Sequence, residues 1–314
     1  MINRSLIRIK VLQLMYAYYQ NGDRNPVSAE KELLLSLSKA YDLYNYLLVL
    51  MVDVTRVARE QVEHQEEVNR IAHLEGEVSH RFVDNRFVAQ LEINRQLNEF
   101  RKEKKLSWYP DKKDYLVKLL SKIQESDVYK EYMSAEEDSY KADQVAWRLI
   151  YKHVIIPDED IDEILEDESL FWNDDREIVD TFVIKTIKQF REENGADQQL
   201  LEEFKDESDR EFAMRLLTRT ITNATYYRSL ISENAKNWEY NRMAFIDTLL
   251  MQIAIAEILS FPEIPVRVTI NEYVELAKLY STPKSGKYIN GLLDHIARRL
   301  HSEGKMMKSI EIKK

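Results

Sequence analysis

The scarcity of glycine constrains this chain more than any other feature of its sequence. Its 314 residues include six glycines and six prolines, whereas glycine usually makes up about 7% of a chain. Glycine most readily adopts the positive φ angles of tight hairpin turns, so a chain this poor in glycine is a weak candidate for a hairpin-rich β protein. The chain is 44% hydrophobic and 32% charged, which is typical of a globular protein. We therefore predict an all-α fold.

Charge is unevenly distributed along the chain, whose net charge is −10. Residues 1–60 contain 8 Lys and Arg against 6 Asp and Glu, and residues 61–119 contain 11 of each. Residues 120–212 contain 11 against 28, whereas residues 213–314 contain 15 against 10. The acidity therefore belongs to one block, and the overall charge does not exclude a polyanionic partner for the two ends.

The acidic block has the pattern of a folded segment. Apolar residues recur at helical spacing through stretches such as 158-DEDIDEILEDES-169. Ser134 with Glu137 three residues later is typical of a helix start. The region also contains three of the tryptophans, Trp108, Trp147 and Trp172. We predict that residues 62–208 form a mostly helical insertion with a core of its own.

The two ends of the chain show clearer helical patterns. Residues 4–20 form one amphipathic helix with a basic start, for which Gly22 is the expected stop. Residues 240–259 are almost continuously apolar, which predicts the central helix of a bundle. The other expected helices are 28–61, 209–232, 269–281 and 287–300.

Several classes of protein are disfavoured. The chain has no cysteine, so it has no disulfide, thiolate metal site or cysteine nucleophile. Arg4, Arg8 and Lys10 interrupt what would be the apolar region of a signal peptide. No apolar run approaches the roughly 20 residues that a membrane-spanning helix needs. We expect a cytoplasmic protein without a membrane partner.

The glycines do not form a nucleotide-binding or cofactor-binding motif. Gly286 and Gly291 have the spacing of a phosphate-binding loop, but leucines follow where that loop needs Lys and Ser or Thr. We interpret Gly291 as allowing close packing of helices. We expect no cofactor.

Metal sites and catalytic constellations are also weakly supported. Glu77 and His80 have the Glu-x-x-His spacing of di-iron bundles, but the sequence has no second such pair. Residues 158–169 resemble the start of a calcium loop, but Glu163 stands where that loop needs glycine. No histidine lies in a recognisable catalytic motif. We predict a protein with no metal site that is not an enzyme.

Basic residues mixed with aromatic ones are the remaining signal. Lysines neutralise phosphates and tyrosines stack on unpaired bases, so such mixtures suit single-stranded RNA. One group stands at the start of the first helix, and a second straddles the turn at Pro283. The candidate RNA-binding residues in these two groups are Arg4, Arg8, Lys10, Lys278, Tyr280, Lys284, Lys287 and Tyr288.

The carboxyl-terminal part resembles the transcription antitermination family NusB. The resemblance rests on 238-WEYNRMAFIDTLLMQIAIAEIL-259, 265-PVRVTINEYVELAKLYS-281 and 284-KSGKYINGLLDHIA-297. The first helix, 8-RIKVLQLMY-16, also looks like the opening of that family. The family fold is all-α, with two three-helix bundles, which agrees with the expected helices. The implied organisation is a first part of the NusB-like domain at 1–61, an acidic helical insertion at 62–208, a second part at 209–304 and a basic tail at 305–314.

The resemblance implies a non-catalytic role in transcription. Members of the family pair with the ribosomal protein NusE, hold the boxA element of nascent RNA and, bound to RNA polymerase, suppress termination in ribosomal RNA operons. In this family Arg4 and Arg8 match an arginine-rich motif, but Ser5 and Leu6 stand where further arginines are usual. Lys284 stands where the family often has an acidic residue. Tyr16 matches the family's tyrosine in the first helix, which makes it a further candidate RNA-binding residue. Lys278, Lys287 and Tyr288 match basic and aromatic positions near the family's later helix turn.

A second hypothesis comes from the partly lost arginines and the acidic net charge. The chain could be an all-helical protein-interaction scaffold that keeps the NusB frame without binding RNA. An acidic insertion beside an RNA site would repel RNA, which motivates an autoinhibitory role for it. The apolar helix faces leave both a monomer and a homodimer open.

Overall fold

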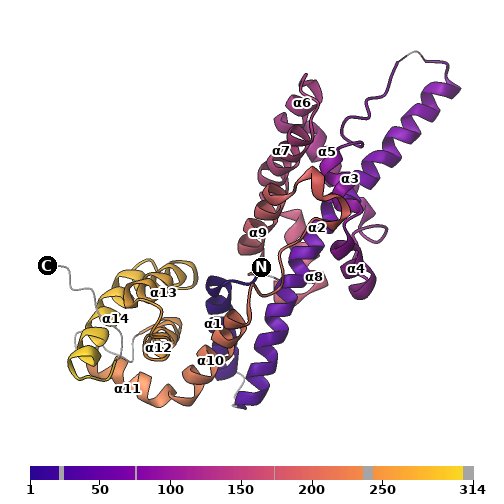
Figure 1. Ribbon diagram of the computed structural model, residues 1–314. Helices are drawn as coiled ribbons and strands as arrows, with labels where there is room; N and C mark the ends of the chain where they lie inside the picture. The colour runs from indigo at the N-terminus through magenta and orange to yellow at the C-terminus, as the bar shows by residue number, and fades with distance from the viewer. Residues whose placement is uncertain (21–24, 75, 173, 236–242, 307–314) are drawn as a thin grey trace. The chain divides into compact units, whose positions relative to one another are not determined.

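The computed structural model describes residues 1–20, 25–74, 76–172, 174–235 and 243–306. These residues form helices joined by turns and short connections (Figure 1). Their one β-type pairing is an isolated parallel bridge between Ile2 and Phe204. The all-α prediction is confirmed. No described helix is both long enough and apolar enough to span a membrane. The stop predicted at Gly22 and most of the predicted basic tail lie outside the described residues.

The chain divides into two compact units. Unit 1 consists of Met1 and residues 38–203, and unit 2 of residues 2–37 and 204–314. Helix α2 (Pro26–Ile71) contributes to both, since its residues up to 37 belong to unit 2 and the rest to unit 1. The boundaries predicted at 61/62 and 208/209 for the family's domain remain a proposal.

Unit 2 is built around one buried helix. Helix α12 (Phe245–Ser260) contacts the other helices of this unit, as predicted for a central helix. Its apolar residues surround the axis, so nearly every position from Leu249 to Ile258 is buried. The predicted start of this helix at Tyr240 lies outside the described residues. The helices around α12 are α1 (Arg4–Gln20), α10 (Glu207–Thr222), α11 (Ala224–Asn234), α13 (Val266–Tyr280) and α14 (Ser285–Ser302).

Two sequence expectations for unit 2 need correction. The single helix expected over 209–232 is divided at Asn223 into α10 and α11. The glycine at the close approach of two helices is Gly286, where a Cβ would lie 3.5 Å from the Val274 side chain of α13. Gly291 is exposed, and a Cβ there would meet no atom within 4 Å. Helical spacing alone does not show which glycine faces a neighbour.

Unit 1 has the core that its tryptophans predict. Trp108 and Trp172 pack on Tyr46 of α2, with ring centroids 4.3 and 5.4 Å away. The buried carboxylate of Asp53, also on α2, accepts hydrogen bonds from the backbone N–H groups of Trp108 (2.9 Å) and Tyr109 (3.2 Å). The other helices of unit 1 are α3 (Arg86–Glu92), α4 (Arg95–Lys104), α5 (Lys113–Glu125), α6 (Asp127–Ser134), α7 (Tyr140–Ile150), α8 (Asp160–Glu168) and α9 (Arg176–Gln189). The short turn η2 (Leu170–Trp172) lies between α8 and α9, and η3 (Glu192–Asp197) follows α9.

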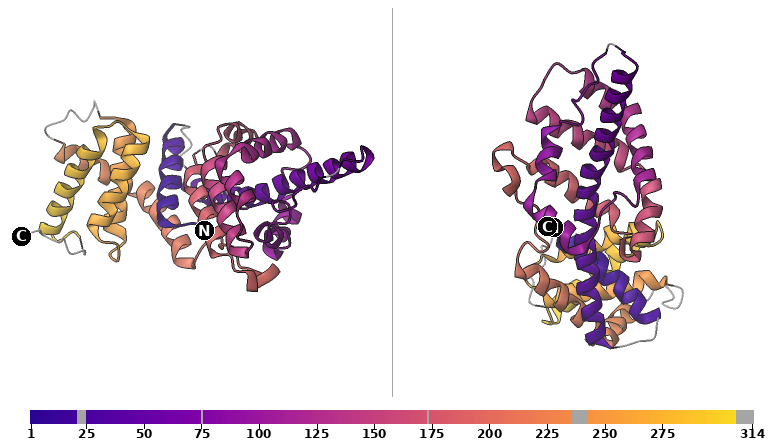
Figure 2. Two further views of the ribbon diagram at one scale, coloured as in Figure 1. Left: turned by 90° about the horizontal axis from the view of Figure 1, so that it is seen from above. Right: turned by 90° about the vertical axis from the view of Figure 1, so that its right-hand side faces the viewer.

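Two helix ends in unit 1 differ from expectation. The second helix was predicted to end near Gln61, but α2 continues to Ile71 and its last turns extend beyond the other helices of the unit (Figures 1 and 2). Most side chains there are exposed, so no apolar periodicity marks the end. Ser134 ends α6 and does not start a helix. The N-cap of α7 is Ser139, whose side chain accepts from the Ala142 N–H.

A π-helical turn, η1 (Tyr151–Ile155), follows α7 directly and is held by a polar network. The Arg176 guanidinium donates to the carbonyls of Ile155 (2.6 Å) and Ile156 (2.9 Å). The buried Tyr151 hydroxyl donates to Asp180 at 2.5 Å. Burial raises the pKa of Asp180 to about 6, although Tyr151 and Arg176 favour its charged form. The cost of burying this carboxylate thus outweighs its partners.

This network predicts a pH-dependent stability. The pKa of Asp180 is higher in the folded chain than unfolded, so its contribution to stability is full below about pH 4 and is lost as the pH rises through about 6. Asp180→Asn removes this dependence. We expect the free energy of unfolding of Asp180→Asn, relative to the unmodified protein, to rise by about 2 kcal/mol between pH 4 and 7.5. Urea unfolding followed by tryptophan fluorescence measures this difference.

The control is Asp162→Asn, because the exposed Asp162 carboxylate pairs with the same Arg176 at 2.6 Å. Its relative stability should change little over the same pH range. Parallel pH profiles for the unmodified protein and Asp180→Asn would contradict the assignment to Asp180.

Candidate nucleic-acid interface

Arg8, on the inner side of α1, forms a buried ion pair with Glu257 of α12. Its Nε and Nη2 each donate to a different oxygen of Glu257 at 2.8 Å, and Nη1 donates to Glu272 of α13 at 3.0 Å. Thr269 (2.8 Å) and Tyr273 (3.0 Å) donate to the same Glu257 carboxylate. All the polar atoms of this bidentate pair are therefore used inside unit 2.

The burial of Arg8 corrects its predicted role. Only 3% of Arg8 is exposed, and Glu257 is fully buried. Burial opposes the charge of Arg8, but the hydrogen bonds and the charge of Glu257 outweigh it and raise the pKa of the guanidinium. A permanently charged, fully bonded side chain in the interior joins three helices and does not face a phosphate.

The other cations of the first helix also differ from expectation. Lys10 is buried, with 2% exposed, so it does not present its ammonium group to RNA. Arg4 is partly exposed, lies over the Phe212 ring at 5.0 Å and pairs with Asp209 at 3.4 Å. Of the three predicted cations in α1, Arg4 alone reaches the surface.

Tyr16 lies in an exposed aromatic cluster that the sequence did not reveal. It is 42% exposed, and its ring lies 5.7 Å from that of Phe245, which is 41% exposed. Tyr19 contacts the same Phe245 at 6.0 Å and carries the Arg228 guanidinium over its ring at 4.6 Å. These residues come from α1, α11 and the first turn of α12. Paired rings with one face in water are suitable platforms for stacking bases.

The second basic group lies at the turn between α13 and α14. The buried Asp247 carboxylate, in the first turn of α12, accepts from Ser281 (2.6 Å) and Ser285 (2.8 Å) and so fixes this turn. Lys284 and Lys287 are exposed on it and make no salt bridge with any described residue.

Lys278 and Tyr288, two other predicted residues at this turn, are less accessible to an anionic partner. Lys278 is exposed, but its ammonium group donates to Glu275 at 2.6 Å. Tyr288 is half-buried, and burial, with Asp247 nearby, raises the pKa of its hydroxyl. Both therefore contribute less to an anionic partner than Lys284 and Lys287 do.

The first turn of α12 brings two of the predicted groups to one end of unit 2. Phe245 contacts Tyr16 of α1, and Asp247, two residues later, holds the turn that carries Lys284 and Lys287. Arg4 is not part of this group, since twelve residues of helix place it about 18 Å from Tyr16 along α1. The candidate interface therefore consists of Tyr16, Tyr19, Arg228, Phe245, Lys284 and Lys287.

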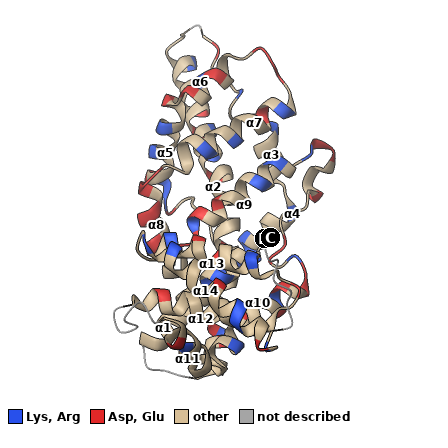
Figure 3. Cartoon of the chain, turned by 90° about the vertical axis from the view of Figure 1, so that its left-hand side faces the viewer, with Lys and Arg blue, Asp and Glu red and all other residues tan. Residues whose placement is uncertain are grey.

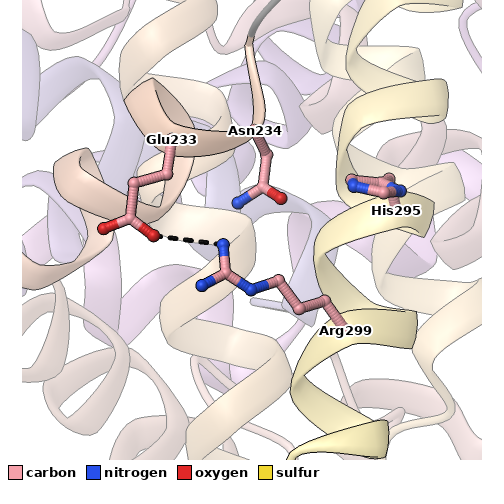
Figure 4. A pocket seen from close by; sticks show the side chains of 4 residues that line it. All are labelled: Glu233, Asn234, His295 and Arg299. Atoms are coloured by element: carbon pink, nitrogen blue, oxygen red, sulfur yellow. Dashed lines mark hydrogen bonds and ion pairs between the residues drawn. The ribbon is translucent and has the colours of Figure 1, made fainter.

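A surface pocket of about 510 Å³ lies elsewhere on unit 2, between α11 and α14. Its described lining is Glu233, Asn234, His295 and Arg299, and the Glu233–Arg299 ion pair at 3.1 Å lies in it (Figure 4). None of the residues predicted to bind RNA lines this pocket.

Sequence reasoning missed Phe245, Tyr19 and Arg228. Phe245 begins an apolar helix, so its periodicity indicated a core position. The sequence held no signal for Phe245, because the burial of Asp247, which points to nearly the opposite side of the helix, is known only from the structure.

Comparisons with known proteins identify relatives of part of the chain. Residues 177–298 match the NusB family. The transcription antitermination protein NusB of Salinibacter ruber is 36% identical over 133 residues, which cover 40% of this chain and 83% of that protein. The NusB of Chloroherpeton thalassium is 44% identical over 100 residues, 32% of this chain and 47% of that protein. This chain therefore spans about half the length of the second relative.

The family match begins inside the segment that was predicted as an insertion, and residues 1–60 lie outside it. A solved structure of T. maritima NusB is 33% identical, covers 37% of this chain and 82% of that chain, and has a TM-score of 0.29.

The burial of Arg8 gives a testable prediction. Arg8→Ala leaves the Glu257 carboxylate buried without its countercharge, so we expect a loss of about 3–5 kcal/mol in the free energy of unfolding. Chemical denaturation measures it. The double variant Arg8→Met with Glu257→Met removes both charges and should recover most of that loss. An Arg8→Ala protein of unchanged stability and lower RNA affinity would show that Arg8 contacts RNA instead.

Proposed function

The chain belongs to the NusB family, and we propose that it is a non-catalytic, RNA-binding transcription antitermination factor. In this proposal unit 2 binds boxA-type single-stranded RNA together with NusE. Binding takes place in the cytoplasm, within the RNA polymerase antitermination complex, during transcription of ribosomal RNA. The carrying observation is the candidate interface, whose two parts are both held by the first turn of α12: Phe245 packs on Tyr16, and Asp247 fixes the turn that carries Lys284 and Lys287.

The chemistry of this end fits a single strand. Lys284 and Lys287 supply two positive charges without local countercharges, and these can neutralise phosphates. The Tyr16 and Phe245 rings supply flat apolar surface for unpaired bases. The Arg228 guanidinium, already over Tyr19, extends that surface with a planar cation.

The scaffold hypothesis also has a supporting observation. Arg8 and Lys10 are buried, so α1 offers fewer phosphate contacts than we predicted from its sequence. A NusB frame whose first helix has lost this contact surface could keep protein partners and lose RNA. An RNA titration separates the two functions.

The deciding experiment titrates boxA-like RNA, with and without NusE, at two salt concentrations. We expect binding that NusE strengthens and that salt weakens. Lys284→Gln with Lys287→Gln should lower the slope of log affinity against log salt by about 1.4, since each single-strand phosphate contact contributes about 0.7. Tyr16→Ala or Phe245→Ala should weaken binding by about 1–3 kcal/mol while leaving that slope nearly unchanged.

The matched control is Arg298→Gln, because Arg298 is exposed on the same helix as Lys287 but pairs with Asp294 at 2.8 Å. Its affinity should match that of the unmodified protein. An absence of RNA binding in every condition would support the scaffold; equal losses for Arg298→Gln and the lysine variants would remove the candidate interface.

A further inference from the structure

Unit 1 is acidic as a whole, yet its positive charges are not all neutralised. Residues 38–203 contain 23 Lys and Arg against 38 Asp and Glu. Most of these cations face a carboxylate, as Lys122 faces Asp158 at 2.6 Å. On α7, η1 and α9, however, a group of cations makes no salt bridge with any described residue. These are Lys141, Arg148, Lys152, Lys185 and Lys188.

Contacts between α7 and α9 fix their relative direction. Gln144 of α7 donates to the carbonyl of Ile187 near the end of α9 at 2.7 Å. Tyr151, just after α7, donates to Asp180 near the start of α9 at 2.5 Å. The two segments are therefore antiparallel neighbours over this length.

The five cations without a salt bridge share one face of this pair, although Lys141 donates to Gln144 at 2.7 Å and Arg148 is half-buried. Lys141, Arg148 and Lys152 are seven and four residues apart, which places them on one stripe of α7 and η1. Lys185 and Lys188 are three residues apart on the solvent side of α9. Both helices turn their buried residues to the same core, so their exposed stripes face the same side of unit 1. Figure 3 colours the Lys and Arg positions of the chain blue, including those on α7 and α9.

We propose that this α7–α9 face is a second RNA-binding surface, which contacts the phosphate backbone without reading sequence. Its cations have no carboxylate within salt-bridge distance, and Glu177 is the one exposed acidic residue among the described residues of α7, η1 and α9. The exposed Glu192 and Glu193 of η3 lie near Tyr140, at the Lys141 end of the face. The half-buried side chains between the cations, Val145, Leu149 and Ile184, offer little apolar surface. Such a face lacks the exposed apolar anchors that favour membrane insertion or a protein hot spot.

RNA as the polyanion rests on the function proposed for unit 2. An RNA long enough to contact both surfaces binds the second one intramolecularly, which raises its overall affinity over that of a short RNA. The acidic insertion is then not uniformly repulsive, because a basic stripe stands within it.

The test uses the full-length protein and two RNAs: a boxA-like oligonucleotide of about 12 nucleotides and a uridine homopolymer several times longer. The variant is Arg148→Gln, Lys185→Gln and Lys188→Gln together. For the homopolymer we expect its salt slope to fall by about 2 and its affinity to fall at least about tenfold at 0.1 M salt. The short RNA should bind nearly as before.

The matched control removes three other exposed, unpaired cations of unit 1, by Lys102→Gln, Lys105→Gln and Lys130→Gln. It changes the net charge equally, and its homopolymer affinity should stay close to that of the unmodified protein. Equal losses in both triple variants would reduce the effect to overall charge, and no loss in the α7–α9 variant would remove the proposed surface. Circular dichroism confirms that each variant is folded.

Two further outcomes separate this proposal from its premise and its rival. In the first outcome, the short RNA does not bind the unmodified protein, but the homopolymer binds the α7–α9 variant more weakly than the unmodified protein. The function proposed for unit 2 would then be wrong, and the α7–α9 surface would remain supported. If vesicles rich in phosphatidylserine, and not RNA, lose affinity in that variant, the face binds lipid and the proposal is overturned.

Discussion

The arrangement of unit 2 depends on one buried ion pair. Arg8 and Glu257 join α1 to the central helix, and Glu272 extends the network to α13. An isolated charge in the interior would be strongly destabilising, so each partner requires the other. Because the guanidinium is bidentate, it also fixes the rotation of α1, which sets where Tyr16, two turns later, meets Phe245. The buried ion pair thus helps to determine the geometry of the exposed end of unit 2.

The same pair shows where sequence reasoning succeeds and fails. Helical periodicity, glycine scarcity and the apolar run of α12 were sufficient for the all-α class and for the central helix, because burial imposes those patterns directly. An arginine on an amphipathic helix has two possible environments, and the difference lies in a carboxylate 249 residues away. Nothing near Arg8 in the sequence contains that information.

Other differences arise from solvated helix turns and from contacts between distant residues. The end of α2 was missed because its last turns are solvated on most sides and carry no periodic apolar stripe. Phe245 lies within the apolar run predicted as the central helix, yet it packs on Tyr16 at the surface. Arg148, Lys185 and Lys188 lie within the acidic segment. Their common face could not be predicted, because it depends on how α7 packs against α9. The net charge of a segment does not reveal a stripe of positive residues on a surface that is negative overall.

The long separation between Arg8 and Glu257 also orders events during synthesis. At about 5–20 residues per second, the ribosome adds the intervening 249 residues in about 12–50 s. Residues 38–203 are complete well before Glu257 emerges, so the insertion can fold while α1 still lacks its partner. Helix α1 is therefore made well before the central helix against which it packs, and its apolar side has no α12 to contact until then.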